Sequence, residues 1–334
     1  MTVFAQAWDL LVKALDPNNF NLDDLIGREA FPKNDRSALH YIMRDPQGKR
    51  EFAKLRSKKI DADLDMTGRD IAPFSASKWS GKEEARDALG GGYSSPGKMI
   101  NQTYSLPTHM CKVGGRLREV PGSVCHNCYA HPADGSSQGY TYAMNNVQRH
   151  LLRNYDALKR DPHRWASALA SKQYGINSVA PRDGLFPEFR WHDSGDADSP
   201  EHLALMAAIA DANPDIWNWL PTREWESTRK LMNARSTLPP NMAMRLSIPH
   251  IDQTLDNDLN EQRGVPLMEQ KYLDMLEEFP QLLTTGVVSD KKLARNRDDI
   301  CLVSDKSQGK KTCMDAQCDA CYKPSVPNVD FVVH

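Results

Sequence analysis

Short apolar runs alternate with longer amphipathic stretches along this chain from about residue 101 onward. Each run has the length and the branched or aromatic content of a strand, and turn residues follow it. The stretches between them carry apolar residues at helical spacing, and one opens with Ser199-Pro200, which suits the start of a helix. The pattern predicts strands at 103–106, 186–191, 216–220, 242–248, 282–288 and 300–303, and helices at 140–159, around 165–174, and at 200–213, 224–234 and 266–278.

Five or six strand–helix units in succession predict an α/β protein with a parallel sheet and helices outside it. A complete or partial (β/α) barrel fits this number of units better than a short open sheet, although an open doubly wound sheet also accommodates them. The earlier part of the chain differs, because residues 1–60 have helical spacing and 61–100 are rich in glycine, serine and charge. We therefore expect a helical and loop N-terminal extension at 1–100, a barrel core at 101–300, and a Cys-rich metal-binding segment at 301–334.

The composition is that of an ordinary globular protein, with 40% hydrophobic and 26% charged residues. No apolar run is long enough to cross a bilayer, and the first residues lack the basic start of a signal peptide. We therefore expect a cytoplasmic protein with no membrane partner. The net charge of −2 does not indicate a nucleic-acid partner. A local basic stretch at 49–59 fits either a phosphate-contacting helix or a solvated helix face.

The seven cysteines form two groups, spaced C-x13-C-x2-C and C-x11-C-x4-C-x2-C, with no cysteine at 129–300. A C-x2-C pair lets two thiolates reach one ion or cluster from a tight turn. An odd number of cysteines excludes complete disulfide pairing, and a reducing compartment favours metal over disulfides, with redox thiols as the alternative. Three ligands leave one coordination position open for chemistry, whereas four can close a site. The expected metal ligands are Cys111, Cys125 and Cys128 in the first group, and Cys301, Cys313, Cys318 and Cys321 in the second.

Polar residues recur where the expected strands end, which is where parallel α/β sheets bind ligands. His192-Asp193-Ser194-Gly195-Asp196 follows an aromatic strand, and two carboxylates with an imidazole exceed what a helix cap needs. The two carboxylates fit a nucleophile with an acid or base, or groups that hold a cofactor's ribose or amine. Arg223 suits a phosphate or carboxylate, and His192 suits a ligand, a base or packing. The candidate catalytic residues are Asp193, Asp196, His192 and Arg223, the candidate cofactor-binding residues are Ser194, Gly195, Tyr129, Thr222 and Ser247, and His250, Ser289 and Asp290 also follow strands.

Four short motifs stand out: Tyr-Ser-Leu-Pro at 104–107, Cys-x-x-Cys-Tyr-Ala at 125–130, Ser-Gly-Asp at 194–196 and Leu-Pro-Thr-Arg at 220–223. Together they resemble a bacteriophage protein family, the Gene 88 protein type, over roughly residues 101–289. The cysteine motif after a first strand also resembles radical S-adenosylmethionine enzymes, whose common spacing is CxxxCxxC. This second resemblance implies a [4Fe-4S] cluster on the first cysteine group, S-adenosylmethionine at its open iron, and an auxiliary cluster on the second group.

A likeness of architecture links the chain to barrel enzymes that exchange guanine for a deazaguanine base, using an aspartate nucleophile and a C-terminal structural zinc. The leading expectation is an iron–sulfur enzyme, similar to the radical S-adenosylmethionine type, that acts on a nucleotide or nucleic acid in phage DNA or nucleobase modification. One alternative is a zinc-containing nucleobase transglycosylase. The other is a non-catalytic, zinc-stabilised nucleic-acid-binding protein. The metal, the exact substrate and the oligomeric state stay open.

Overall fold

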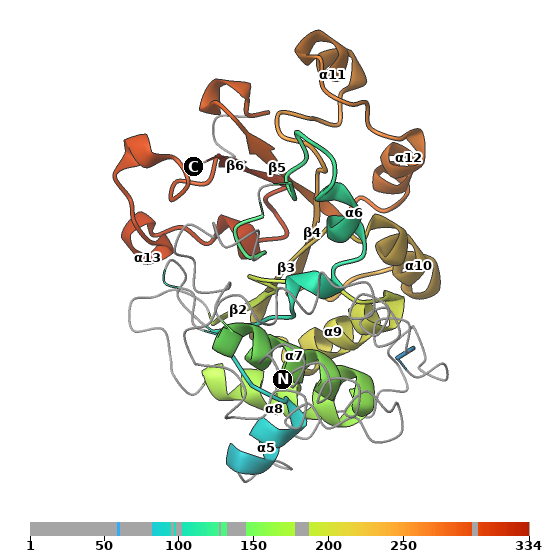
Figure 1. Ribbon diagram of the computed structural model, residues 1–334, viewed down its shortest axis with the longest axis vertical. Helices are drawn as coiled ribbons and strands as arrows, with labels where there is room; N and C mark the ends of the chain where they lie inside the picture. Colours follow the sequence, from blue (N-terminus) through green and yellow to red (C-terminus); the bar gives the residue numbers. More distant parts are fainter. Residues whose placement is uncertain are drawn as a thin grey trace, which may run out of the picture.

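The computed structural model describes residues 59–60, 82–94, 97, 102–126, 128–131, 145–177, 187–295 and 300–333. Its centre is a six-stranded sheet in which every neighbouring pair is parallel and the strands follow chain order (Figure 1). Parallel neighbours need crossover connections, so helices lie between successive strands. The strands are β1 (Thr103–Tyr104), β2 (Glu188–Trp191), β3 (Trp217–Thr222), β4 (Met242–Ser247), β5 (Leu283–Val288) and β6 (Asn328–Val332).

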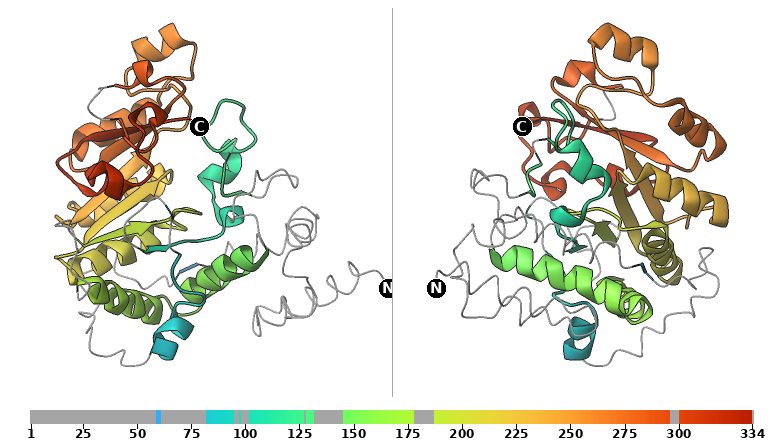
Figure 2. Two further views of the ribbon diagram at one scale, coloured as in Figure 1. Left: turned by 90° about the vertical axis from the view of Figure 1, so that its left-hand side faces the viewer. Right: turned by 45° about the vertical axis from the view of Figure 1, so that its right-hand side comes forward.

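The longer helices form a layer against the sheet (Figures 1 and 2), in which α8 packs on α7 and α9, and α9 packs on α10. Ser199 caps α9 as the sequence predicts, since its side chain accepts the His202 N–H at 3.3 Å. The helices are α5 (Lys82–Ala88), α6 (Val113–Leu117), α7 (Asn145–Arg160), α8 (Pro162–Asn177), α9 (Pro200–Ala212), α10 (Trp225–Arg235), α11 (Asn257–Arg263), α12 (Gln270–Glu278) and α13 (Cys313–Ala316), with 3-10 turns η2 (Thr108–Met110), η4 (Lys291–Leu293), η6 (Lys306–Gln308) and η7 (Ala320–Tyr322).

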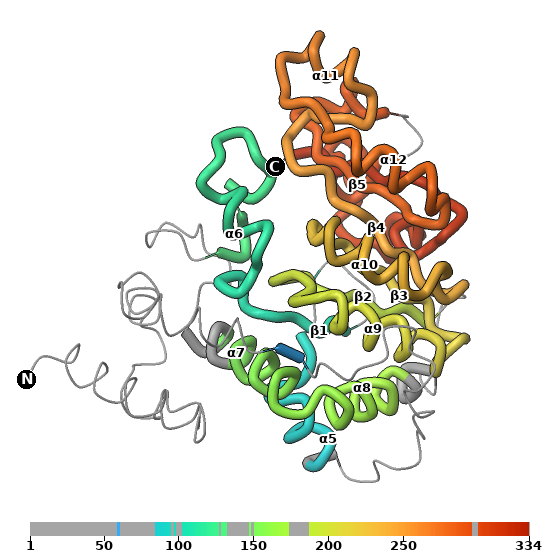
Figure 3. Tube along the Cα trace, turned by 90° about the vertical axis from the view of Figure 1, so that its right-hand side faces the viewer, coloured from blue at the N-terminus to red at the C-terminus, as the bar shows by residue number. Residues whose placement is uncertain are grey.

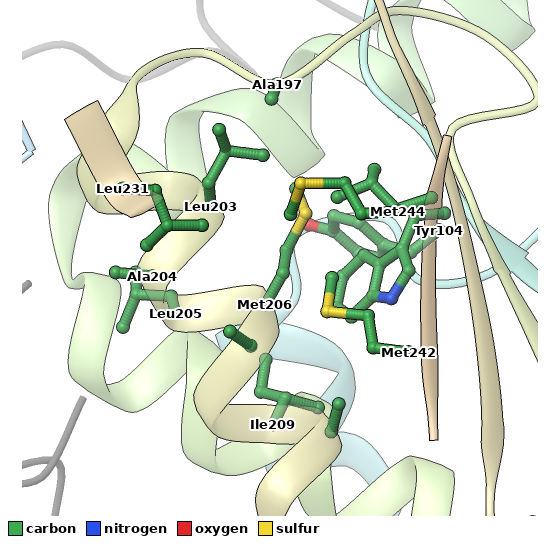
Figure 4. Close-up of a cluster of buried hydrophobic side chains, with 14 of the residues drawn as sticks. Tyr104, Ala197, Leu203, Ala204, Leu205, Met206, Ile209, Leu231, Met242 and Met244 are labelled. Atoms are coloured by element: carbon green, nitrogen blue, oxygen red, sulfur yellow. The ribbon is translucent and has the colours of Figure 1, made fainter. Parts of the chain in front are cut away.

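One face of the sheet packs against these helices and forms the main hydrophobic core. Side chains alternate along a strand, so Phe189 and Trp191 of β2 share this face with Leu220 of β3. Figure 4 shows Met206 of α9 beside Met244 of β4 in the same core. Each such apolar side chain contributes about 1.5–3 kcal/mol when fully buried, so this layer is the main source of stability.

The opposite face carries polar and aromatic residues and is covered by the C-terminal segment. Trp219 of β3 packs edge-on against Tyr322 of η7, with ring centroids 5.7 Å apart. Arg245 of β4 is fully buried and donates to main-chain carbonyls of this segment. The second cysteine group therefore lies on the face away from the main helical core.

Most expected elements between residues 101 and 290 are confirmed, with ends shifted by a few residues. Helix α7 is described from Asn145, and residues 140–144 of the expected helix lie outside the described part of the chain. The helix α11 was not predicted, because its seven residues are too few for a clear apolar period. The helices expected at 1–60 also lie outside the described residues, as does the basic stretch at 49–59 apart from exposed Lys59.

The strand expected at 300–303 is wrong. Ile300 forms a single bridge with Asp330, and the chain turns immediately afterwards. The sixth strand is instead Asn328–Val332, which pairs with β5 along its whole length. Val303 of this run is buried, and the Cys301 N–H donates to the Asp330 carbonyl. The turn that follows prevents a longer series of strand hydrogen bonds.

The described strands form an open sheet with β1 and β6 at its edges. A mixed α/β fold with a parallel sheet is therefore confirmed, whereas pairing between β1 and β6 that would close a barrel is not observed among these strands. The division into segments 1–100, 101–300 and 301–334 stays a prediction. Among the residues that the structure describes, no helix is long and apolar enough to span a membrane.

Candidate functional site

The loop after β1 carries the first cysteine group and lies across the carboxyl ends of the next three strands (the teal segment around α6 in Figure 3). Its start joins the segment after β2, where the Leu106 N–H donates to the Ser194 carbonyl at 3.0 Å. Its middle joins the segment after β3, where the Val113 N–H donates to the Glu224 carboxyl at 2.9 Å. Its end joins the segment after β4 through the Val124 N–H. The loop thus covers the edge at which parallel sheets bind ligands.

Two thiols of this loop, those of Cys111 and Cys125, lie beside Gly114. A Cβ atom built on Gly114 would lie 3.4 Å from the Cys125 Sγ and 3.9 Å from the Cys111 Sγ. Burial is the main cause of the raised pKa of Cys111, and the neighbouring charge of Cys128 adds to it. Thiols in this state stay protonated unless a cation or metal stabilises the thiolate. The loop brings the three expected ligands together, and their role as ligands stays a prediction.

Asp196 and two arginines place fixed charge beside these thiols. The Asp196 carboxylate accepts hydrogen bonds from the Ala197 N–H at 2.7 Å, the Thr222 hydroxyl at 2.7 Å and the Arg223 N–H at 2.9 Å. Burial raises the pKa of Asp196, and these hydrogen bonds oppose the rise. Burial also raises the pKa of Cys125, whereas the charges of Arg223 and Arg118 lower it. Two cations therefore stand where thiolate charge would form, which suits thiolate ligands.

Asp193 is held from two sides. Ser105 donates its hydroxyl to the Asp193 carboxylate, and Tyr129 donates its hydroxyl to the Asp193 main-chain carbonyl. Asp193 is only 3% exposed, whereas Tyr129 is 45% exposed beside Cys128. The structure therefore brings Tyr129 and Asp193 together and leaves the tyrosine ring accessible to a ligand.

Gly195 allows the segment after β2 to approach β1 closely. Its φ is +84°, and a Cβ atom at this position would lie 2.4 Å from the Leu106 carbonyl oxygen. The Ser194 hydroxyl donates to the same carbonyl at 3.2 Å. Both residues therefore have a structural role in the fold, and the cofactor contact expected of them stays a prediction.

His192 packs into the layer between the sheet and α9. Its φ is +53°, its N–H donates to the Tyr104 carbonyl at 3.0 Å, and its ring centroid lies 5.6 Å from that of His202. Burial lowers the pKa of His192 to about 3, with a smaller effect from the Arg190 charge. The neutral ring and these neighbours favour the packing interpretation over that of a base beside Asp196.

The remaining strand-end residues differ in their contacts. Ser247 is buried, and its carbonyl accepts the Trp225 indole N–H at 3.1 Å. Ser289 binds both Asp252 carboxylate oxygens at 2.7 Å. Asp290 caps the short 3-10 turn η4, which is the ordinary role of a polar residue at a strand end. The segment after β4 also pairs with the first cysteine loop, through a bridge between His250 and Ser123.

The second cysteine group lies on the polar face and is anchored by Arg245. The guanidinium donates to the carbonyls of Ala320 at 2.8 Å, Cys321 at 2.9 Å and Lys323 at 3.1 Å. Burial raises the pKa of Cys313 to about 12, and the charges of the neighbouring thiols add to the rise. The sequence reasoning missed Arg245, although a lone arginine in the buried strand Met-Ala-Met-Arg-Leu-Ser was a usable signal. It also missed Arg118, Arg190 and Glu188.

All seven cysteines lie in the described part of the chain as unpaired thiols. In that part, no group of three or more His, Cys, Asp or Glu side chains is arranged to hold a single metal ion. A tetrahedral zinc site would need sulfur atoms about 3.8 Å apart, given Zn–S bonds near 2.3 Å. In an iron–sulfur cluster each thiolate binds a different iron, so the sulfur atoms lie further apart. Cys125 is buried, Cys111 and Cys128 are half-buried, and arginine charge lies beside them, so the donor set has the chemistry of thiolate ligands.

The family model described as Gene product 88 matches residues 76–324, which include both cysteine groups and the strands β1 to β5. Neither the curated proteins nor the solved structures contain a match.

Proposed function

The chain belongs to the Gene product 88 family, and we propose that it is an iron–sulfur enzyme that modifies a nucleotide or nucleic acid. One observation supports this most strongly. One buried thiol, two half-buried thiols, Asp196 and two arginines gather at the carboxyl ends of parallel strands. Three thiolates hold a [4Fe-4S] cluster with one iron open, and the bound cluster supplies one-electron chemistry at that iron. S-adenosylmethionine is the cofactor that we expect there, and the sequence-ordered open sheet is compatible with the partial barrel of such enzymes.

The residues of this chain have separable tasks in the proposal. Arg223 and Arg118 stabilise negative charge on the thiolates. Burial lowers the pKa of Arg223, but the negative charges of the thiolates and Asp196 outweigh this effect and raise it, so the guanidinium stays charged. Asp196 fixes the Arg223 main chain and Thr222, which places both beside the first group. The exposed Tyr129 ring offers a stacking surface for a base next to Cys128.

The second cysteine group has four ligands and can close a site without leaving a position open. We assign it a second cluster that ties the C-terminal segment to the sheet, because its described thiols are not arranged around a single metal ion. Arg245 supports this assignment, because it holds the Cys-x-x-Cys turn by three carbonyls.

The transglycosylase alternative has weaker support. An attacking carboxylate must reach the sugar, but Asp193 and Asp196 are at most 9% exposed and both carboxylates accept hydrogen bonds. The non-catalytic alternative differs from the leading proposal in its metal, so metal content separates them.

The test is purification of the full chain without oxygen, followed by visible spectroscopy and quantification of iron, sulfide and zinc. We expect a brown protein with several irons per chain. Cys125→Ser should remove the iron of the first group, and Cys318→Ser should remove the metal of the second. Val120→Ala, at an exposed position in the same loop, is the matched control and should change nothing. A colourless protein that contains only zinc would refute the iron–sulfur assignment.

A further inference from the structure

The two cysteine groups are joined by a continuous set of side-chain contacts through Arg190 of β2. Arg190 lies on the polar face of the sheet, in register with Trp219 of β3. Its guanidinium carbon lies 4.7 Å from the Trp219 ring centroid, within the range of a cation–π contact. The planar cation is thus held against a buried indole.

On one side, Arg190 reaches the first cysteine group. Its side chain forms a hydrogen bond with Tyr129, which directly follows Cys128. The Tyr129 hydroxyl in turn donates to the Asp193 carbonyl. Tyr129 therefore accepts from Arg190 and donates to the segment after β2, so the arginine helps to fix the Cys-x-x-Cys turn.

On the other side, Arg190 reaches the second cysteine group. The Trp219 ring that it covers packs edge-on against Tyr322, the residue after Cys321. Phe331 of β6 stacks on Trp219, with an interplanar angle of 12° and centroids 6.3 Å apart. These contacts leave the indole little freedom to move independently of the C-terminal segment.

We propose that Arg190 is a positioning residue that couples the two cysteine groups, so that metal bound by the second group strengthens metal binding by the first. This inference rests on the proposed metal binding at both groups, but not on the metal being iron. Four thiolates around one Zn²⁺ carry a net negative charge, and four thiolates around a [4Fe-4S] cluster do as well. Either occupant attracts the Arg190 cation, which holds Tyr129 in place. Linkage requires the effect to be reciprocal.

A double-mutant cycle tests the coupling. The full-length protein is purified without oxygen as wild type, Cys318→Ser, Arg190→Gln and the double variant, and each is challenged with increasing chelator. Loss of metal from the first group is measured by alkylation of Cys125 and Cys128, quantified by mass spectrometry. In the wild-type background, Cys318→Ser should lower the chelator concentration that exposes these thiols by about fivefold or more. In the Arg190→Gln background, the same change should have no further effect.

Two further variants keep the test decisive. Arg229→Gln, at an exposed position of α10, is the matched control and should keep the full effect of Cys318→Ser. Tyr129→Phe removes the hydroxyl between Arg190 and Asp193 and should abolish the coupling even if Arg190→Gln folds poorly. Equal effects of Cys318→Ser in all backgrounds, no effect in wild type, or a first group that is never protected would each overturn the proposal. If both groups hold only zinc, the iron–sulfur function fails, but the same cycle still decides the coupling.

Discussion

Replacement of Gly195 by alanine should destabilise the fold by about 3 kcal/mol, because two separate costs combine at this position. The first is conformational: the φ of +84° disfavours any residue with a Cβ by about 1 kcal/mol. The second is steric: the new Cβ would lie 2.4 Å from the Leu106 carbonyl oxygen, which is main chain and cannot rotate away. The two segments must separate, which breaks the Leu106 N–H bond to Ser194 and the Ser194 hydroxyl bond to Leu106, at about 1 kcal/mol each.

Gly122→Ala separates the two costs. Gly122 has a φ of +80°, but nothing lies within 4 Å of a Cβ built there. It should therefore show only the conformational cost of about 1 kcal/mol. Urea unfolding of both variants, followed by circular dichroism, gives the two free energies of unfolding. If Gly195→Ala is no less stable than Gly122→Ala, the close approach of the two segments is not as described.

Three other sites give predictions of the same kind. Arg245→Met should lower the free energy of unfolding by about 3 kcal/mol, because three buried carbonyls lose their charged donor, and metal analysis should show loss from the second cysteine group only. Gly114→Val should reduce metal at the first group with little change in urea midpoint, because the new side chain enters the space between two thiols. The control Gly115→Val meets open space and should keep the metal. His192→Asn should reduce the loss of stability on acidification. Burial lowers the folded-state pKa of His192 to about 3, so the stabilising contribution of its neutral ring is present above pH ~6.5. That contribution is lost as pH falls toward 3, by at most about 1.4 kcal/mol per pH unit. Urea unfolding at pH 7, 6 and 5 measures this, and parallel pH profiles for wild type and variant would contradict it.

The strands and helices between residues 101 and 290 were predictable from the sequence because apolar period and turn residues are local signals. The same holds for the helix cap at Ser199 and for the polar residues at strand ends. The spacing of Cys125 and Cys128 also places two thiols on one turn without reference to the rest of the fold. Each of these inferences depends only on residues that are near one another in the chain.

Other features depended on contacts between distant residues. The strand prediction at 300–303 was wrong because an apolar run does not reveal whether a neighbouring strand has room for it, and Asn328–Val332 takes that place beside β5. His192 has the composition of a catalytic group, yet burial against α9 keeps it neutral. In the sequence, Arg245 is a single charge in an apolar strand. Only the packed C-terminal segment shows which carbonyls accept its hydrogen bonds.

Apolar period and cysteine spacing already indicate a parallel α/β protein with two thiol groups, since both are properties of the chain alone. The positions of the two groups relative to each other depend on the folded arrangement. They gather separately, one over the strand ends and one on the polar face of the sheet, and Arg190 and Trp219 lie between them. That relation arises because the crossovers bring β2, β3 and the C-terminal segment together, and no local pattern records which distant side chains then share a face.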